Sequence, residues 1–193
     1  MKRLFIAIAA LGLIGAACGA SGDDTAGTSR AVHNQSDIGF LQGMIPHHEQ
    51  AVTMSGYAST RAASPQVKDL AKRIEGAQAP EIKQMTGLLK DWGVKEETAG
   101  HSGMGGMGGT GGMGSHPGML TDDDLGRLKA AKGQEFDRLF LQGMIGHHRG
   151  AITASEEQQS KGESQEAKSL AGEIINAQRA EIAEMEQLLV SAQ

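Results

Sequence analysis

The sequence has a single cysteine, Cys18, among its 193 residues, and few aromatic side chains. One cysteine cannot form a disulfide within the chain, so a metal site in the rest of the protein must use histidine, methionine, aspartate or glutamate. Aromatic residues make up only 3% of the chain. The core must therefore be built from leucine, isoleucine, valine, alanine and methionine, a composition that suits closely packed helices better than sheets.

An excess of basic charge and a long apolar run are also missing. Aspartate and glutamate number 23 against 18 lysines and arginines, and no basic patch favours nucleic acid as a partner. The apolar run from Leu4 to Ala17 falls short of the roughly 20 residues that span a bilayer. Because this run follows Lys2 and Arg3, we interpret residues 1–17 as a signal peptide and expect an exported protein.

The residues from Leu13 to Cys18 resemble a bacterial lipobox, in which the cysteine becomes the acylated first residue of a lipoprotein. Gly15 stands where that motif prefers leucine, so a plain secretory signal on a secreted or periplasmic protein is the alternative. We expect Cys18 to carry a lipid anchor that attaches the protein to the outer face of a bacterial membrane. Residues 18–35 are mostly small and polar without periodicity, which predicts a flexible tether.

The dominant feature of the chain is an internal repeat. Phe40–His48 reads FLQGMIPHH, and Phe140–His148, one hundred positions later, reads FLQGMIGHH. The register then holds without a gap to the C-terminus. We predict an all-α fold, a four-helix bundle made of two duplicated helical hairpins. Within this domain of residues 36–193, the first repeat covers residues 36–93, a linker rich in glycine, methionine and histidine covers 94–120, and the second repeat covers 121–193.

Hydrophobic periodicity predicts four helices, with bounds at about 36–60, 66–92, 121–160 and 165–190. The first helix is capped near Ser36 and Asp37. The second contains Pro80, which we expect to kink it because proline lacks a backbone donor. The third opens at Thr121, with a break allowed near Gly133.

Polar side chains interrupt the apolar faces at one level of each hairpin. His47 and His48 lie about 15 residues before the turn of the first hairpin, and Gln78 and Glu81 lie about 15 to 18 residues after it. The same residue types recur at the same level of the second hairpin. Burying imidazole, carboxylate and amide groups without partners costs several kcal/mol, and metal ligation would offset that cost.

Thioether sulfur and imidazole nitrogen together favour copper, and Cu(I) in particular. Met44 is spaced i,i+4 from His48, so both donors can converge from one helix. The candidate ligands are His47, His48, His147, His148, Met44, Met144, Glu81, Glu181, Met85 and Met185. Surrounding residues that would orient these ligands are Gln78, Gln178, Asp37 and Asp137.

Two other interpretations of this level stay open. Histidines on an apolar face can be hydrogen-bonded core residues, and methionines at helical spacing can be packing residues. Adjacent helical residues also point about 100° apart. One histidine of each pair would then bind metal while the other forms a hydrogen bond with Glu81 or Glu181.

The linker offers six further soft ligands, which we expect to capture Cu(I): His101, Met104, Met107, Met113, His116 and Met119. The alternative is a glycine-rich tether whose methionines bind nothing. His33 lies outside the predicted helices, and we expect it to be solvated.

The repeated motifs carry a family resemblance. In each repeat an Asp-x-x-Phe-x-x-x-Met-Ile-x-His-His pattern, beginning at Asp37 and at Asp137, is followed by Gln-x-x-Glu-Ile-x-x-Met. This pattern resembles the domain of unknown function 305 family over about residues 36–193. The resemblance implies a ferritin-like fold and, as in some members, an exported copper-binding protein linked to copper resistance. The second repeat differs from the first in having Arg149, Gly150 and Ala154 in place of Glu49, Gln50 and Met54.

We therefore expect a protein that sequesters or delivers copper, and we favour a role without catalysis. One alternative is a ferritin-like di-iron or di-manganese carboxylate oxidase, and another is a structural bundle without metal. An oxidase of that kind uses Glu-x-x-His motifs, and neither His-His pair belongs to one. The expected partners are a metal ion and a membrane, and the sequence identifies no protein partner.

Overall fold

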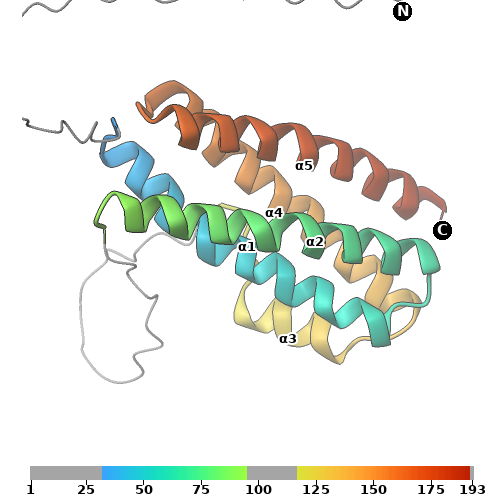
Figure 1. Ribbon diagram of the computed structural model, residues 1–193. Helices are drawn as coiled ribbons and strands as arrows, with labels where there is room; N and C mark the ends of the chain where they lie inside the picture. Colours follow the sequence, from blue (N-terminus) through green and yellow to red (C-terminus); the bar gives the residue numbers. More distant parts are fainter. Residues whose placement is uncertain (1–31, 95–116, 192–193) are drawn as a thin grey trace, which may run out of the picture. The chain divides into compact units, whose positions relative to one another are not determined.

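The structure, a computed structural model, describes residues 32–94 and 117–191 of the chain. In those two ranges it contains five α-helices and no β-strand. The helices are α1 (Gln35–Arg61), α2 (Pro65–Asp91), α3 (Asp122–Ala130), α4 (Gln134–Lys161) and α5 (Gln165–Ser191) (Figure 1). The predicted all-α class is confirmed. The predicted third helix is divided into two, α3 and α4.

The four long helices form the bundle. α1 packs along α2 and α4, and α5 packs along α4 and α2, so each long helix has two long neighbours. Short turns join α1 to α2 and α4 to α5, which makes each pair an antiparallel hairpin. Figure 1 shows α2 and α5, which belong to different repeats, running side by side. The predicted four-helix bundle of two hairpins is confirmed, and α3 is an addition that lies against α1 and α4.

A capping box fixes the start of α1. The Asn34 side chain accepts a hydrogen bond from the backbone N–H of Asp37, and the Asp37 carboxylate accepts one from the N–H of Asn34. The cap is therefore Asn34, two residues before the predicted Ser36. Asp37 contributes as the third residue of the helix.

Glycine separates α3 from α4. Gly133 has a φ of 65°, a left-handed conformation that favours glycine, and its N–H donates a hydrogen bond to the carbonyl oxygen of Arg61 at 2.7 Å. This bond ties the α3–α4 connection to the end of α1. α2 continues through Pro80 to its end at Asp91.

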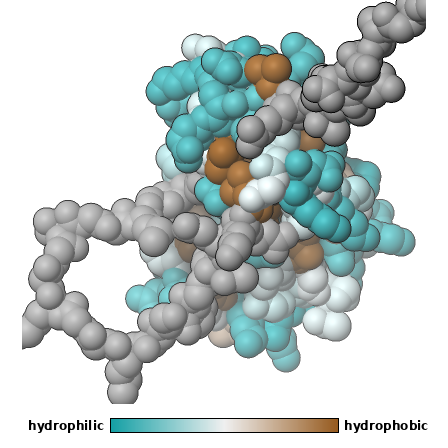
Figure 2. Space-filling view, turned by 60° about the vertical axis from the view of Figure 1, so that its left-hand side comes forward, coloured by the Kyte–Doolittle hydropathy of each residue, from teal (hydrophilic) through white to brown (hydrophobic). Residues whose placement is uncertain are grey.

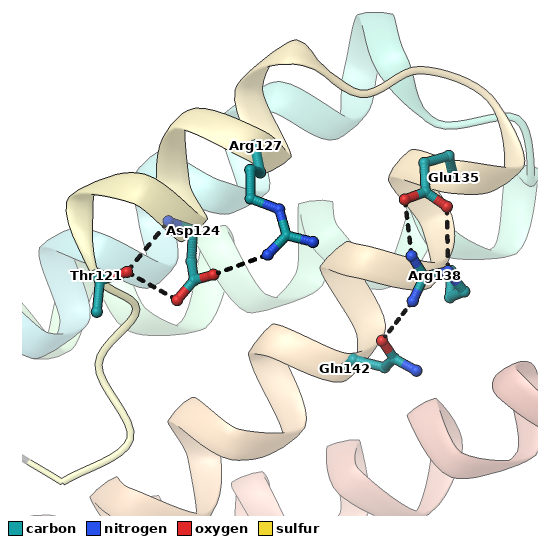
Figure 3. A network of polar contacts seen from close by, with 6 residues as sticks. All are labelled: Thr121, Asp124, Arg127, Glu135, Arg138 and Gln142. Atoms are coloured by element: carbon teal, nitrogen blue, oxygen red, sulfur yellow. Dashed lines mark hydrogen bonds and ion pairs between the residues drawn. The ribbon is translucent and has the colours of Figure 1, made fainter.

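Polar contacts within α3 and within α4 lie on either side of the connection between these helices (Figure 3). Thr121 caps α3: its Oγ1 accepts a hydrogen bond from the Asp124 N–H at 3.2 Å and donates one to the Asp124 carboxylate at 2.8 Å. Arg127 lies 3.5 Å from the other carboxylate oxygen. On α4, Arg138 donates hydrogen bonds to Glu135 and Gln142. Such exposed pairs stabilise little, but the cap fixes the point at which the chain enters α3.

Apolar side chains form two clusters, one toward each end of the bundle. α1 contributes its first half to one cluster and its second half to the other, and α4 does the reverse. The first cluster includes Leu70, Phe136, Phe140, Met144 and Met185, and the second includes Phe40, Leu41, Met44, Met85 and Leu170. Burying side chains of this size stabilises the fold by roughly 1.5–3 kcal/mol each.

The outer surface contrasts with this interior. The face drawn in Figure 2 is mostly hydrophilic, with small hydrophobic patches between the polar side chains. Among the described helices, none has the combination of length and apolar character that is required to cross a bilayer.

Two aspartates, one hundred positions apart, join the hairpins. Asp37 of α1 accepts hydrogen bonds from two backbone N–H groups in the turn before α5, at 3.0 and 3.1 Å, and from the side chain of Gln158. Asp137 of α4 accepts hydrogen bonds from two backbone N–H groups in the turn before α2, at 3.1 and 2.9 Å. Each hairpin thus uses one carboxylate to hold the interhelical turn of the other.

The Asp37 carboxylate should contribute stability that depends on pH. Burial alone would raise the pKa of Asp37, but hydrogen bonds from the backbone of Asn34 and the α4–α5 turn, and from Gln158, outweigh it and hold that pKa below its usual range. Because the pKa of Asp37 is lower in the folded chain than in the unfolded one, this contribution is present above about pH 4 and is lost as the pH falls through the folded pKa.

We predict that Asp37→Asn lowers the free energy of unfolding at pH 7 by about 2–3 kcal/mol, because the amide nitrogen replaces an acceptor oxygen. Urea denaturation at pH 7 and pH 3.5 measures the effect, and the difference from the unchanged protein should shrink at the lower pH. Asp137→Asn is the matched control and should cost less, because Asp137 accepts fewer hydrogen bonds. Equal losses in the two variants would contradict this assignment.

Candidate metal centre

A layer of polar side chains crosses the middle of the bundle between the two apolar clusters. On α1, His47 and His48 lie between Met44, which belongs to one cluster, and Ala51, which belongs to the other. The other three long helices show the same change of cluster around their polar positions. This polar layer consists of His47, His48, Gln78, Glu81, His147, His148, Gln178 and Glu181.

All four imidazoles of the polar layer are fully buried, with 0% relative exposure. Two of them are held by a carboxylate of their own hairpin. Nε2 of His48 lies 2.7 Å from Oε2 of Glu81, and Nε2 of His148 lies 2.7 Å from Oε2 of Glu181. This is the arrangement in which a glutamate holds one histidine of each pair. The other histidine of each pair is left for a different role.

The other two histidines meet across the hairpins. The rings of His47, on α1, and His147, on α4, have centroids 3.7 Å apart and planes tilted by 39°. Nε2 of His47 lies 3.3 Å from the carbonyl oxygen of Pro117, while neither ring nitrogen of His147 has a hydrogen-bond partner among the described residues. Burial, reinforced by the three neighbouring histidines, lowers the pKa of His147 to about 2. The ring is therefore neutral at physiological pH, which is the form that binds metal ions.

The acceptors determine where three of the rings carry their hydrogen. Carbonyl and carboxylate oxygens accept hydrogen bonds, so Nε2 is the donor in His47, His48 and His148. In a neutral ring the lone pair then lies on Nδ1. Nδ1 of His48 and Nδ1 of His148 have no hydrogen-bond partner in the part of the chain that the structure describes. A carboxylate that fixes the tautomer in this way is the usual support of a metal-binding histidine.

The rest of the polar layer and its borders also suit a soft metal ion. The side-chain amides of Gln78 and Gln178 are buried and form no hydrogen bond within residues 32–94 and 117–191. Fully buried methionines border the layer on both sides, Met44 and Met85 in one apolar cluster and Met144 and Met185 in the other. Buried imidazoles and amides without partners, close to thioether sulfur, are the donor set expected of a soft-metal site.

Histidine and carboxylate side chains alone do not complete a metal site in the polar layer. Among the described residues, no group of three His, Cys, Asp or Glu side chains is placed to hold one metal ion. Glu81 and Glu181 are each engaged with a histidine. A metal ion in the polar layer would therefore need methionine sulfur or glutamine oxygen besides imidazole. This requirement favours Cu(I) over ions that prefer several carboxylates.

The structure corrects two sequence-based expectations about side chains near this layer. Asp37 and Asp137 were expected to orient the ligands, but they lie ten residues before His47 and His147, roughly 15 Å along the helix. Their carboxylates bind the interhelical turns, as described above. His33, expected to be solvated, stacks on Trp92 with ring centroids 4.3 Å apart.

Most of the predicted linker site cannot be placed. Met119 is half-buried, in the segment that precedes α3. The remaining predicted linker ligands lie outside the described residues, as does Cys18: these are His101, Met104, Met107, Met113 and His116. Their capture of copper stays a prediction.

Sequence reasoning missed the contact between residues 117–120 and the polar layer. Gln50, one turn after His47, holds this segment through both ends of its amide. Its Nε2 donates a hydrogen bond to the Leu120 carbonyl oxygen at 3.0 Å, and its Oε1 accepts one from the Leu120 N–H at 2.8 Å. The available signal was the difference between Gln50 and Gly150, at equivalent positions of repeats that otherwise match closely here.

Comparison with known proteins gives a family and several similar structures. The sequence profile of a domain of unknown function, DUF305, matches residues 37–189. A DUF305 protein from Streptomyces coelicolor, named as a candidate secreted protein, has a TM-score of 0.70 and 29% identity, covering 81% of this chain and 93% of that chain. CopM in its Cu(I)-bound form has a TM-score of 0.65 and 30% identity, covering 82% of this chain and 98% of that chain.

A further relative is an uncharacterised protein of Acanthamoeba polyphaga mimivirus. It is 42% identical over 55 residues, which are 28% of this chain and 36% of the viral protein. The match therefore spans about a third of the length of that curated relative.

The two kinds of buried histidine should respond in opposite ways to replacement by leucine. In the metal-free protein, His147→Leu should raise the free energy of unfolding by about 1–2 kcal/mol, because it removes a buried ring without partners. His148→Leu should lower it, because Glu181 loses its partner. Denaturation in the presence of a chelator measures both, and a loss of stability in His147→Leu would contradict the account of this ring.

His147→Leu should also change how stability depends on pH. The unfolded chain protonates His147 near pH 6.5, whereas the folded chain does so only near pH 2. Stability should therefore fall on acidification between these values, by up to about 1.4 kcal/mol per pH unit from this residue. Between pH 7 and 5, His147→Leu should show a smaller decline than the unchanged protein. Parallel pH profiles would count against the low pKa of His147.

Proposed function

Since the chain belongs to the domain of unknown function 305 family, we propose that it is a copper-binding protein that holds its cargo ion in the polar layer. The observation that carries this proposal is the fully buried pair His47 and His147, with ring centroids 3.7 Å apart and no hydrogen-bond partner among the described residues for either nitrogen of His147. A bundle that served packing alone would be more stable with apolar side chains there. CopM, which has been solved with Cu(I), Cu(II) and Ag, supports copper as the ion.

We assign the metal ligands from the polar layer and its borders. Imidazole nitrogen comes from His47 and His147 of different hairpins, or from Nδ1 of His48 and of His148, which Glu81 and Glu181 orient. Among the described residues no three of these side chains are placed to bind the same ion. Thioether sulfur comes from the bordering methionines Met44, Met85, Met144 and Met185. Gln78 and Gln178 stand beside the ligands as amide hydrogen-bonding groups. This set is rich in soft and intermediate donors, which supports Cu(I) as the preferred ion.

The role that fits this site is sequestration or delivery of copper. The imidazoles have no exposed surface, so a metal ion held there is shielded from solvent and from other reactants. A di-iron or di-manganese oxidase is less well supported, because the polar layer contains only two carboxylates and each is paired with a histidine. We therefore propose binding without catalysis.

We also propose that the protein is exported and anchored by a lipid on Cys18, and that the methionines and histidines of the linker capture copper for the bundle. The apolar run that precedes Cys18 supports export. The candidate secreted protein from Streptomyces coelicolor supports it further. A flexible linker must lose conformational entropy to surround an ion, so its copper should be held more weakly than that of the packed layer.

Copper titration against a Cu(I) chelator tests the proposed ligands. The double variant His47→Leu and His147→Leu should lose the tight class of Cu(I), with affinity reduced by at least about 100-fold, equivalent to about 2.7 kcal/mol. Leucine keeps the volume and the packing, so circular dichroism should still show a helical bundle. Deleting residues 101–116 is the control and should lower the copper stoichiometry while keeping the tight class. Retention of tight binding by the double variant would show that the histidines are structural.

The lipid anchor has a separate test in the bacterial host. Cys18→Ser should move the protein from the membrane fraction to the soluble fraction, because the acylated side chain is lost. Replacing the neighbouring Ser21 by Ala is the control and should leave the distribution unchanged. Unchanged partitioning of the Cys18→Ser protein would favour the secretory alternative.

A further inference from the structure

The segment Pro117–Leu120, which we call the strap, lies against His47 of the histidine pair and against the backbone of α4 on either side of His147. The carbonyl oxygen of Pro117 is 3.3 Å from Nε2 of His47. His47 is fully buried, whereas Pro117 and Gly118 are exposed. The strap therefore contacts the buried histidine with one side of its backbone and is exposed on the other.

On α4 the strap packs against a surface of glycine backbone at Gly146 and Gly150. A Cβ atom on Gly150 would lie 1.5 Å from the carbonyl oxygen of Pro117, and one on Gly118, whose φ is 90°, would lie 2.4 Å from the carbonyl oxygen of Gly146. The two backbones thus touch directly, which only glycine allows. The side-chain position of Gly146 itself is open, with no atom within 4 Å of a Cβ there.

α1 provides the latch. Gln50 makes its two hydrogen bonds to the backbone of Leu120, at 2.8 and 3.0 Å. The side-chain amide thus binds both the N–H and the carbonyl group of the last strap residue. Thr121 caps α3 directly after the strap, which fixes its C-terminal end (Figure 3).

The repeats have diverged in a way that serves the strap. Positions 50 and 150 are equivalent, yet one is the glutamine that holds the strap and the other is the glycine that makes room for it. Positions 46 and 146 likewise differ, as proline and glycine. The second of these is the one difference between Phe40–His48 and Phe140–His148. A duplicated surface has thereby become two complementary parts.

We propose that the strap is the removable cover of the histidine pair, and that Gln50 and Gly150 are positioning residues that set how often it opens. Opening breaks the contacts of the strap with Gln50, His47 and the apolar cluster against which Leu120 packs, but leaves the four long helices packed on one another. It therefore controls how fast an ion reaches or leaves the pair, without being needed for the bundle to fold. The choice of Cu(I) as that ion rests on the proposed function.

Two glycine-to-alanine variants one turn apart on α4 make a matched test in the full chain. Gly150→Ala places a methyl group where the Pro117 carbonyl lies and should lift the strap, whereas Gly146→Ala adds the same group to open space. Both changes raise helix propensity equally, so that effect cancels in the comparison. Gln50→Leu removes the latch without adding a clash and is a second, independent variant.

Three measurements report opening, two of which need no metal. Hydrogen exchange of the Leu120 amide in the metal-free chain should be at least about tenfold faster in Gly150→Ala than in Gly146→Ala. The added methyl group prevents the strap from packing on α4, and the hydrogen bond of this amide to Gln50 is then broken more often. Modification of His47 by diethyl pyrocarbonate should rise in parallel. For the loaded chain, stopped-flow transfer of Cu(I) to an excess of chelator should accelerate by about tenfold in Gly150→Ala and Gln50→Leu.

The outcomes separate this inference from the proposed function. Equal amide exchange, equal His47 modification and equal transfer rates in the two alanine variants would overturn the strap as a cover. If the unchanged chain holds no Cu(I) in the bundle, the proposed function fails. Amide exchange and His47 modification then still decide whether the strap controls access to the pair.

Discussion

Polar groups that are buried without hydrogen-bond partners lower the stability of a fold, and the layer at the centre of this bundle contains several of them: the ring of His147 and the side-chain amides of Gln78 and Gln178 have none among the described residues. Two apolar clusters, one on each side, supply the burial that stabilises the bundle. Glu81 and Glu181 satisfy one ring nitrogen of His48 and of His148. The rings of His47 and His147 lie 3.7 Å apart, and neither ring nitrogen of His147 has a hydrogen-bond partner among the described residues. The copper ion proposed above would supply the interaction that His147 lacks.

The duplication explains how this layer is held in register. Each hairpin contributes the same residues, and each places one aspartate, Asp37 or Asp137, on the interhelical turn of the other. The carboxylates fix the two hairpins at the ends of the bundle, while the histidines meet at its middle. Holding the ends in this way allows the central layer to keep groups that do not stabilise it.

One departure from the repeat, Gln50 against Gly150, lies where the strap contacts α1 and α4. The strap needs a bare surface on one helix and hydrogen-bond donors and acceptors on the other, and two identical helices cannot offer both. Gly150 and Gln50 meet these two needs at equivalent positions. The symmetric part of the molecule thus forms the candidate metal centre, and the asymmetric part covers it.

Much of this arrangement was predictable from the sequence. The period of 3.6 residues predicted the four long helices, and the rise of 1.5 Å per residue placed the histidines level with Gln78 and Glu81 within each hairpin. The pairing of a histidine with a glutamate follows from that level, because a hairpin with a short turn has only one register. The motif of the domain of unknown function 305 family could be recognised in the sequence because it is a fixed set of spacings along two adjoining helices.

Only the tertiary structure decided how the hairpins face each other. Three contacts join residues from different hairpins or from the linker: the tilted ring pair of His47 and His147, the turn contacts of Asp37 and Asp137, and the position of the strap. Periodicity along one chain segment carries no information about the rotation of a second hairpin around it. The sequence by itself therefore determined which groups are buried at the central level, and the packing between hairpins determined which of them meet.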